Sequence, residues 1–322
     1  MTTTIVEAPA RLHFGLLPAD SIGALFGGCG VMLERPVVKV RIDPAEEWKV
    51  VGVHAEKSSG FVAHWRQFFQ TAKPTATGSC RVEVLEAPPL HSGLGTGTQL
   101  GLSIAAGLFS HFEGDVPGPH TLARSVQRGK RSAIGTFGFV HGGLLIDRGK
   151  QGAADPMAEL DFQLPLPEDW RWVISRPQES PGLSGDEERQ VFERPPSNLS
   201  SSRQQMVDLM KSQLVPAAVQ GDFTQLSQAI YDYGYAAGMA FVAEQGGPFN
   251  GRRVTQLVEY CRSQGVRGVG QSSWGPTVFS LHQDREHADA FASHLREELG
   301  AEVVIAKTQN RGAKITRTES AS

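Results

Sequence analysis

The stretch Pro89-Leu-His-Ser-Gly-Leu-Gly-Thr-Gly-Thr98 follows a strand-like run at 81–86. After it, Leu100, Ile104 and Leu108 recur at every fourth position, which predicts a buried helix directly behind the glycines. Such glycines let backbone amide groups approach an anion, and a helix N-terminus favours negative charge. The loop therefore predicts a phosphate site, but a strand-to-helix turn without a ligand has the same pattern, and the Gly-Lys-Ser/Thr of a Walker A loop is missing. The candidate phosphate-binding residues are Ser92, Gly93, Gly95, Thr96, Gly97 and Thr98.

Strand and helix patterns continue on both sides of this loop. Branched apolar residues at 4–7 and 37–42 predict strands, and the aromatic residues of 61–69 predict a core-facing helix. The first third of the chain is therefore expected to be rich in strands.

The second half has mainly helical patterns. We expect helices at 201–219, 223–242, 252–263 and 285–299, and strands at 140–147, 170–177 and 303–306. The polar, proline-containing stretch 148–168 is the best candidate for a domain boundary, and the tail after Lys314 is expected to fray. Because helices and strands do not alternate strictly, we predict an α+β architecture with domains at 1–160 and 161–322.

Length and composition favour a soluble enzyme of two domains. The 322 residues exceed the usual size of one compact core, and 40% of them are hydrophobic. A net charge of −3 gives no general attraction to nucleic acid or to anionic membranes. We find neither a signal-peptide pattern nor an apolar run of bilayer length. Three distant cysteines, Cys29, Cys80 and Cys261, suit reduced thiols and a cytoplasmic location.

A basic cluster lies at 128–136, where Arg128, Lys130 and Arg131 precede Ser132. Three cations within four residues can hold a sugar phosphate or diphosphate through charge-assisted hydrogen bonds. The alternative is the solvated basic end of a helix. We select Lys130, Arg131 and Ser132 as candidate catalytic residues.

The stretch 268–277 combines glycines, hydroxyl groups and one indole ring. Its candidate substrate-binding residues are Gln271, Ser272, Ser273 and Trp274. The alternative for the indole is a place in the core, which is the more common position of a lone tryptophan.

Arg11 and His13 lie two residues apart on a predicted strand, so both side chains face the same side. They complete the candidate catalytic set. In the stretch 181–188, Ser184 is a candidate substrate ligand and Glu188 a candidate ligand of Mg²⁺. The alternative there is ordinary capping, because acidic residues in the first turn stabilise a helix N-terminus.

Together these segments resemble the GHMP superfamily, which includes galactokinase, homoserine kinase and mevalonate kinase. Its phosphate loop, Pro-x-x-x-Gly-Leu-Gly-Ser-Ser, is similar to residues 89–97, and its opening Ala-Pro-Gly-Lys is similar to residues 8–11. The resemblance covers nearly the whole chain. It implies a two-domain α+β fold, with an N-terminal domain like domain 2 of ribosomal protein S5 and a ferredoxin-like C-terminal domain.

One position departs from the kinases of this superfamily. Mevalonate-type kinases carry Ser-Gly-Ile-Asp-Asn followed by Gly-Gly, and here residues 132–136 lead to Gly142-Gly143 at the same spacing. The aspartate that activates the attacking hydroxyl is replaced by Gly135, which has no side chain to deprotonate a hydroxyl. We therefore predict that ATP is not a substrate. Some relatives, such as homoserine kinase, work without this aspartate, so a kinase is kept as an alternative.

Three motifs are similar to those of one branch of the superfamily, the β-ribofuranosylaminobenzene 5'-phosphate synthases. They are Arg-Gly-Lys-Arg-Ser-x-Ile-Gly, Gly-Leu-Ser-Gly-x-x-Glu and Gly-Gln-Ser-Ser-Trp-Gly-Pro-Thr, with Ala133 at a position where the branch more usually has glycine. The resemblance implies condensation of 4-aminobenzoate with 5-phosphoribosyl 1-diphosphate, with Mg²⁺ and with release of CO₂ and diphosphate. This reaction belongs to the biosynthesis of methanopterin-type cofactors.

That chemistry suggests partners for the aromatic acid. Trp274 is the candidate stacking surface for the ring, and Arg11 the candidate cation for the carboxylate. We expect small-molecule substrates, no nucleic acid or membrane partner, and a homodimer as the candidate assembly. The alternatives are an ATP-dependent small-molecule kinase and a non-catalytic protein that binds a phosphorylated metabolite.

Overall fold

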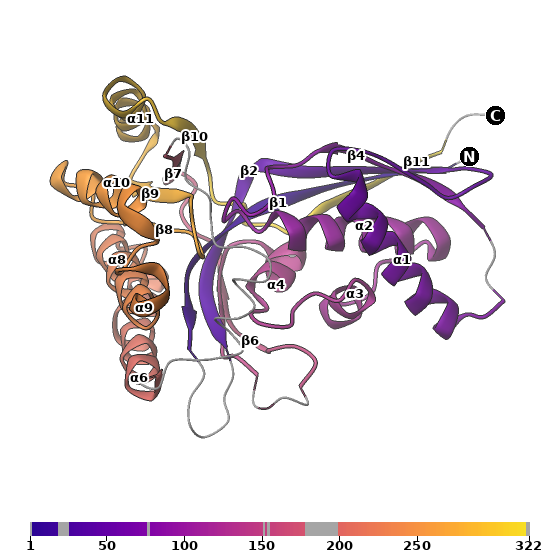
Figure 1. Cartoon of the computed structure of the whole chain (residues 1–322), viewed down its shortest axis with the longest axis horizontal. Coiled ribbons are helices and arrows are strands. Elements are labelled where there is room, and N and C mark those ends of the chain that lie inside the picture. The colour runs from indigo at the N-terminus through magenta and orange to yellow at the C-terminus, as the bar shows by residue number, and fades with distance from the viewer. Residues whose placement is uncertain are drawn as a thin grey trace.

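The computed structural model describes residues 2–18, 26–75, 78–150, 152, 155–177 and 199–319. Two β-sheets organise this part of the chain, and helices pack against each of them (Figure 1). The predicted α+β architecture is confirmed. None of the helices in these ranges has the length and apolar character that crossing a bilayer requires.

The first sheet has seven strands in the described ranges, in the order β11-β1-β2-β4-β3, with β5 between β2 and β6. Neighbouring strands are antiparallel except for the parallel pair β3 and β4. The strands are β1 (Thr2–Leu17), β2 (Gly27–Pro44), β3 (Lys49–Gly52), β4 (Cys80–Glu86), β5 (Leu144–Asp147), β6 (Leu160–Leu164) and β11 (Lys314–Glu319).

Four helices pack against this sheet (Figure 1). They are α1 (Ala55–Ala72), α2 (Thr96–Glu113), α3 (Pro119–Ser125) and α4 (Ile134–His141). Leu100, Ile104 and Leu108 of α2 are fully buried, as their spacing predicts. The aromatic residues of α1 are also core residues, since Trp65 stacks on Phe69 with ring centroids 4.5 Å apart.

The second sheet has four antiparallel strands in the order β10-β7-β9-β8. Its strands are β7 (Arg171–Arg176), β8 (Val269–Gln271), β9 (Val278–His282) and β10 (Glu302–Ala306). Its helical elements are α6 (Leu199–Leu209), the π-helical turn η1 (Met210–Leu214), α7 (Val215–Gln220), α8 (Phe223–Met239), α9 (Val242–Gln245), α10 (Gly251–Ser263) and α11 (Arg285–Leu299). Their bounds agree closely with the predicted helices.

Strand β1 connects the two halves, because α8 packs directly on it. A Cβ atom added to Gly15 would lie 2.2 Å from the Cβ atom of Ala237, so only glycine permits this approach. The hydroxyl of Tyr233 donates to the Gly15 carbonyl at 3.1 Å. The end of β1 is therefore fixed by a helix of the second half.

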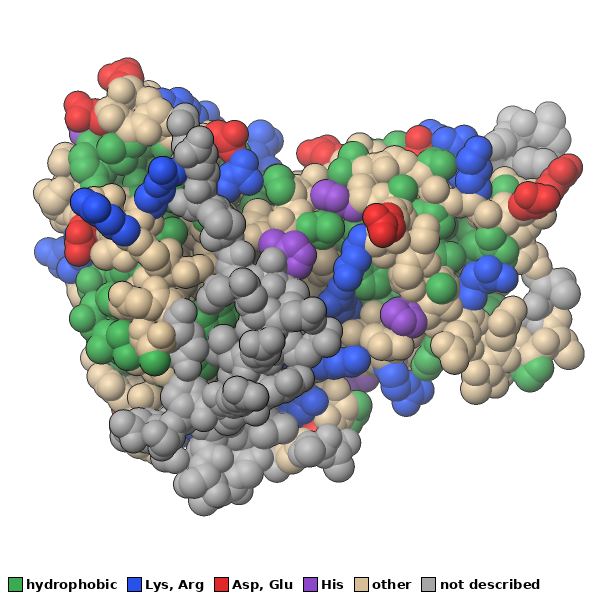
Figure 2. Space-filling model, viewed as in Figure 1, with side chains coloured by type: hydrophobic (Ala, Val, Ile, Leu, Met, Phe, Trp, Pro, Cys, Tyr) green, Lys and Arg blue, Asp and Glu red, His purple; other side chains and the backbone are tan. Residues whose placement is uncertain are grey.

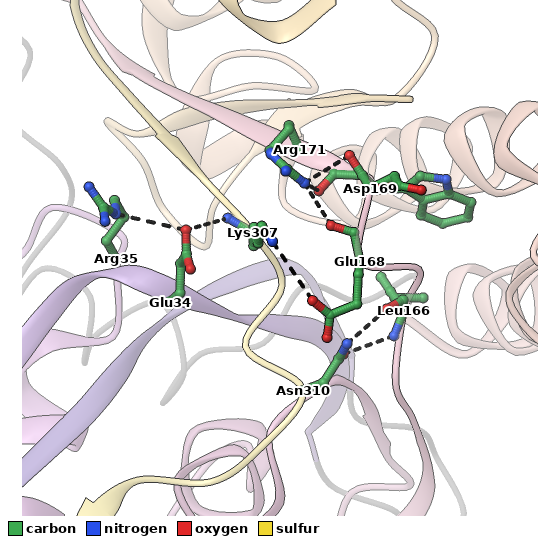
Figure 3. A network of polar contacts seen from close by, with 9 residues as sticks. Glu34, Arg35, Leu166, Glu168, Asp169, Arg171, Lys307 and Asn310 are labelled. Atoms are coloured by element: carbon green, nitrogen blue, oxygen red, sulfur yellow. Dashed lines mark hydrogen bonds and ion pairs between the residues drawn. The ribbon is translucent and has the colours of Figure 1, made fainter. Parts of the chain in front are cut away.

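A polar network joins the second sheet to the first where the chain returns from β10 (Figure 3). Asn310 pairs through both side-chain atoms with the backbone of Leu166, at 2.8 and 2.9 Å. The Glu34 amide donates to the Lys307 carbonyl at 3.1 Å. These contacts direct the returning chain towards β1.

The predicted strand at 140–147 is too long at its start. Val140 and His141 form the last turn of α4, and β5 begins only at Leu144. Gly142 and Gly143 have φ values of 71° and 79°, so they turn the chain between helix and strand. The predicted strand was wrong at its start because it included these two glycines, whose backbone continues neither α4 nor β5.

The segment after Lys314 does not fray as expected. It forms β11 and pairs with β1 from Thr2 opposite Glu319 to Glu7 opposite Lys314. This pairing satisfies backbone groups at an edge that would otherwise be open. Because β6 and β11 both join the first sheet, the predicted division at residue 160 does not separate the two sheets.

Candidate active site at strand β1

Three of the segments selected from the sequence meet at β1. The Arg11 amide donates to the Leu94 carbonyl at 3.0 Å, which fixes the glycine-rich loop to the strand. The His13 amide donates to the Ser272 hydroxyl at 3.0 Å, and the Ser273 amide donates to the His13 carbonyl at 2.9 Å. His13 therefore lies between the loop after β4 and the segment between β8 and β9.

The glycine-rich loop and the segment 272–277 are also in direct contact. The Ser272 hydroxyl donates to the Gly93 carbonyl at 2.6 Å, and the Thr277 hydroxyl donates to the Ser92 carbonyl at 2.5 Å. Gly93 has a φ of 85°, and a Cβ atom there would lie 2.6 Å from the Ser272 carbonyl oxygen. Two segments that were selected separately from the sequence therefore lie together.

Two hydroxyl groups of the glycine-rich loop donate hydrogen bonds to one of the carbonyl oxygens of the loop itself. Ser92 and Thr96 both donate to the Pro89 carbonyl, at 2.8 and 3.2 Å, and both side chains are buried. In the first turn of α2 the amides of Thr98 and Gln99 donate to the Gly95 carbonyl at 3.0 Å, whereas the helix offers no acceptor to the amides of Thr96 and Gly97. The first turn contains no acidic residue. An anion would therefore meet backbone amides and the positive end of the α2 dipole. The hydroxyl groups of Ser92 and Thr96 hold the loop in shape.

Two arginines lie beside the loop. A Cβ atom added to Gly95 would lie 3.2 Å from Nε of Arg11, and one added to Gly97 would lie 3.6 Å from Nη2 of Arg128. The Arg128 guanidinium also lies over the Phe61 ring, 4.8 Å from its centroid. Arg128 thus reaches the loop by packing along an aromatic face of α1.

The other two cations of the basic cluster have different surroundings. Lys130 is exposed, and its amino group lies 3.4 Å from the Gln127 side-chain oxygen. Arg131 is partly buried. Figure 2 shows several Lys and Arg side chains near the middle of the face of the molecule that it draws. Their predicted role in holding phosphates stays a prediction.

A buried chain of polar groups links Ser132 to β1 and β5. The Ser132 hydroxyl donates to Oδ2 of Asp147 at 2.7 Å and lies 3.2 Å from Nε2 of His13. The amides of Ala133 and Gly149 donate to the two oxygens of Asp147, at 2.8 and 3.0 Å. Asp147 therefore holds the chain ahead of α4 in place.

Burial shifts the pKa of both ionisable ends of this chain. Desolvation, with a smaller contribution from the Arg11 charge, holds the pKa of His13 well below its usual value, so the imidazole is neutral near pH 7. Desolvation raises the pKa of Asp147 from 3.8 to about 6, although donors from Ser132, Ala133 and Gly149 act in the opposite direction. The site is therefore able to hold a neutral imidazole next to a carboxylate that ionises in the acid range.

Gly135 stands where mevalonate-type kinases have their aspartate. It is buried in the first turn of α4, and a Cβ atom there would lie 3.1 Å from Cγ2 of Thr98. The Gln99 side chain donates to the Gly135 carbonyl at 2.8 Å. The position therefore has no side chain for deprotonating a hydroxyl and little space for one.

Trp274 is buried, with 6% of its surface exposed, and meets Phe241 edge-on at 5.2 Å between ring centroids. A hollow of about 30 Å³ lies beside it, lined also by Phe14 and Gly238. That space holds about two water molecules, so a substrate ring would stack on Trp274 only after the hollow opened. The stacking role stays a prediction.

Gln271 contributes to the structure around this hollow. Its side chain accepts from the Asn250 amide at 2.7 Å and donates to the Ser273 carbonyl at 2.8 Å and to the Gln245 side chain at 3.2 Å. These bonds leave it few positions for a substrate. Its predicted substrate contact also stays a prediction.

The described residues offer little for a metal ion. They contain no group of three or more His, Cys, Asp and Glu side chains placed to hold one. Both oxygens of Asp147 already accept hydrogen bonds from the protein. Glu188, the predicted ligand of Mg²⁺, and Ser184, the predicted substrate ligand, lie outside the described residues. The described part of the site therefore does not fit a metal held mainly by protein side chains.

Comparison with known proteins adds a family and a fold to this geometry. Residues 214–301 match the family described as GHMP kinases C terminal. The structure of Lactococcus lactis galactokinase with galactose superposes with a TM-score of 0.71, at 13% identity over 97% of this chain and 95% of that one. The chain has the GHMP-kinase fold. The glycine-rich loop at 92–98 is the predicted phosphate loop, and its binding of phosphate stays a prediction.

Two relatives are similar over almost their whole length. The β-ribofuranosylphenol 5'-phosphate synthase of Methanothermobacter thermautotrophicus is 27% identical, over 96% of this chain and 97% of the relative. The protein of the same name from Archaeoglobus fulgidus is also 27% identical, over 96% and 98%. The predicted resemblance to this branch of the GHMP fold is thus confirmed. These names specify a phenol, whereas the motifs were matched to enzymes that form an aminobenzene.

Sequence reasoning missed two residues of this site. Arg128 belongs to the basic cluster, but the candidate catalytic residues included only Lys130 and Arg131 of its three cations. Asp147 was not selected, although a carboxylate that ends the apolar run Leu144-Leu-Ile was an available signal. A charge at the end of a buried strand needs partners, and here Ser132 is one of them.

Proposed function

We propose that this chain is a synthase that joins a para-substituted benzoate to 5-phosphoribosyl 1-diphosphate, a decarboxylating pentosyl transfer that releases CO₂ and diphosphate. The similarity to two synthases over 96% of the chain supports this proposal over the kinase alternative. The single observation in the structure that carries it is Gly135, because the position of the kinase base has no side-chain atoms and an added Cβ atom would lie 3.1 Å from Cγ2 of Thr98.

Departure of diphosphate requires that its developing charge be stabilised. The amide groups at the start of α2 and the guanidinium of Arg128 are the described groups that suit this task. We propose that Arg131 and Lys130 add further charge from the edge of the site. Since the described residues provide no cluster of metal ligands, the proposed requirement for Mg²⁺ depends on the substrate phosphates and on Glu188.

Bond formation at the ribose needs orientation more than a strong base. The ring carbon that bears the carboxylate supplies the electron pair for the new bond to the anomeric carbon, whose bond to diphosphate breaks. Cleavage of the carbon–carboxylate bond then returns an electron pair to the ring as CO₂ leaves, so no proton is gained or lost. A site with a neutral His13 and no kinase aspartate is compatible with this sequence.

The acceptor is a benzoate with an electron-donating group opposite the carboxylate. The sequence motifs predict 4-aminobenzoate, and the names of the relatives indicate the corresponding 4-hydroxy compound. We propose Arg11 as the partner of the carboxylate, because its side chain lies along the phosphate loop at Gly95. Trp274 remains the proposed ring contact, and a homodimer and a cytoplasmic location remain predictions.

The decisive experiment incubates purified protein with 5-phosphoribosyl 1-diphosphate, Mg²⁺ and carboxyl-labelled 4-aminobenzoate or 4-hydroxybenzoate. We expect labelled CO₂ and diphosphate in equal amounts and a ribosylated product by mass spectrometry. Omission of the sugar diphosphate is the control for non-enzymatic decarboxylation. ADP formation from ATP with a small alcohol, without CO₂ release from either benzoate, would show that the kinase alternative is correct.

A further inference from the structure

Asp147 is buried, and each of its oxygens has a defined donor. Oδ2 accepts from the Ser132 hydroxyl and the Ala133 amide, and Oδ1 accepts from the Gly149 amide. None of its surface is exposed. A carboxylate with three donors on two oxygens is an acceptor only, so the direction of each hydrogen bond is fixed.

The Ser132 hydroxyl therefore has no proton left for His13. Its hydrogen is directed at Asp147, and its oxygen also accepts from the Ile134 amide at 3.3 Å. The 3.2 Å contact between this oxygen and Nε2 of His13 is a hydrogen bond only if Nε2 carries the imidazole proton. In the neutral ring, Nδ1 is then a bare acceptor.

Nδ1 of His13 is buried and has no donor among the described residues. The ring is held tightly, because a Cβ atom at Gly28 would lie 2.5 Å from its Cε1 atom. Its backbone is hydrogen-bonded to the Ser272 hydroxyl and the Ser273 amide. A buried acceptor without a donor is costly unless water or a ligand completes it.

We propose that Asp147 is a positioning residue, which orients the Ser132 hydroxyl and thereby leaves Nδ1 of His13 as the acceptor for a hydroxyl or amino group of a substrate. The inference rests on the proposed function, whose substrates offer such donors in the ribose hydroxyls and in the para substituent of the aromatic acid. Ser132 transmits the orientation and is not a nucleophile in this arrangement, since its single proton and its lone pairs are already engaged.

The test compares Asp147→Asn with Asp161→Asn as a matched control. Asparagine has one acceptor oxygen, so either orientation of its amide places a donor against the donors of Ser132 and Ala133 or against the Gly149 amide. Asp161 lies on the neighbouring β6, is about half exposed and pairs with Arg148 at 3.0 Å. The control makes the same chemical change outside the site.

The first measurement is ¹⁵N NMR of labelled imidazole, with the His13 signals assigned by their loss in His13→Gln. In the unmodified protein and in Asp161→Asn we expect a protonated Nε2 and a bare Nδ1. In Asp147→Asn the released Ser132 hydroxyl turns to Nε2, and the proton moves to Nδ1. A protonated Nδ1 in the unmodified protein, or the same tautomer in all variants, would overturn the proposal.

The second measurement is steady-state kinetics with both substrates varied. We expect Asp147→Asn to lower kcat/KM about tenfold or more, and Asp161→Asn to leave it unchanged. A rise in KM confined to the sugar diphosphate identifies a ribose hydroxyl as the donor, and one confined to the benzoate identifies its para substituent. Unchanged kinetics in Asp147→Asn would contradict the proposal.

The proposal can still be tested if Asp147→Asn does not fold or if the unmodified protein shows no synthase activity. If Asp147→Asn does not fold, Ser132→Ala tests the same link, and an unchanged kcat/KM in that variant would refute it. If the unmodified protein shows no synthase activity, the proposed function fails, but the NMR comparison still decides whether Asp147 sets the tautomer.

Discussion

The phosphate loop and the basic cluster face the same part of the molecule but are built differently. The loop at 92–98 is formed by backbone groups, and hydroxyl groups of Ser272 and Thr277 from the second half occupy its carbonyl oxygens. The cluster at 128–132 depends on long side chains, of which Arg128 packs along Phe61 whereas Lys130 extends into solvent. A single added methyl group can disturb a loop whose backbone is closely packed. In the basic cluster, one cation can partly replace the charge of another. The two regions should therefore respond very differently to mutation.

The largest effect is expected at Gly93, where the backbone itself is at stake. Gly93→Ala puts a Cβ atom 2.6 Å from the Ser272 carbonyl oxygen at a φ of 85°. The strain of about 1–3 kcal/mol, with the displaced loop, should weaken binding of inorganic diphosphate roughly a hundredfold. Isothermal titration calorimetry measures this. Gly60→Ala is the control, since nothing lies within 4 Å of its added methyl group, and it should leave affinity unchanged.

Intermediate effects are expected in the basic cluster. Arg128→Ala and Arg131→Ala each remove a charged donor worth about 1.5–3 kcal/mol, so the KM for the sugar diphosphate should rise about ten- to a hundredfold. The KM for the benzoate should change far less. Lys130→Ala should have the smallest effect of the three, because its side chain is exposed. If all three variants behave like the unmodified protein while folded, the cluster is only a solvated surface.

A smaller effect is expected from the hydroxyl that joins the two halves. Thr277→Val keeps the shape of the buried side chain but leaves the Ser92 carbonyl without its donor, which should lower the free energy of unfolding by about 1–3 kcal/mol. Thr277→Ser keeps the hydroxyl and should lose less. Urea unfolding and diphosphate titration of both variants measure the difference. If both variants bind diphosphate equally well, the hydrogen bond from Thr277 contributes to stability but does not determine the shape of the loop.

A change of pH is expected to act on the unmodified protein with opposite signs for stability and activity. The pKa of Asp147 in the folded protein is raised to about 6, so the folded state binds its proton more tightly than the unfolded chain. Its contribution to the free energy of unfolding should therefore fall as pH rises from about 4 to about 6. His13, Cys29 and Tyr233 are the titratable groups that approach it, from β1, β2 and α8.

Activity should rise with pH in that same window, because the ionised carboxylate orients Ser132. Thermal unfolding and initial rates between pH 4.5 and 8, roughly, measure both trends with Asp147→Asn as the reference. If stability and activity both rise with pH in this window, groups other than Asp147 determine the pH dependence below neutral pH.

The same contrast explains what the sequence could predict. Glycine-rich loops reveal themselves because the residue type and the backbone conformation are linked, so the loop, the helix behind it and the 272–277 segment were found from spacing. The basic cluster was recognised, but the sequence did not single out Arg128, because its approach to the loop depends on packing along Phe61, which lies 67 positions earlier.

The remaining misses also depended on distant partners. Asp147 acquires its role only when β5 brings it next to Ser132 and β1 brings His13 there as well. The tail after Lys314 is polar and short and has no apolar pattern of its own, so its pairing with β1 could not be read locally. Contacts of this kind arise from topology, which periodicity does not encode.

The position of β11 beside β1 has a consequence for the order in which the site can be assembled. During synthesis β1, which carries Arg11 and His13, is made some 300 residues before the six residues 314–319 that pair with Thr2–Glu7. For all of that time the edge offers unpaired backbone groups to any other extended chain. Pairing of Thr2–Glu7 with residues 314–319 therefore ends the period in which this edge can join another extended chain.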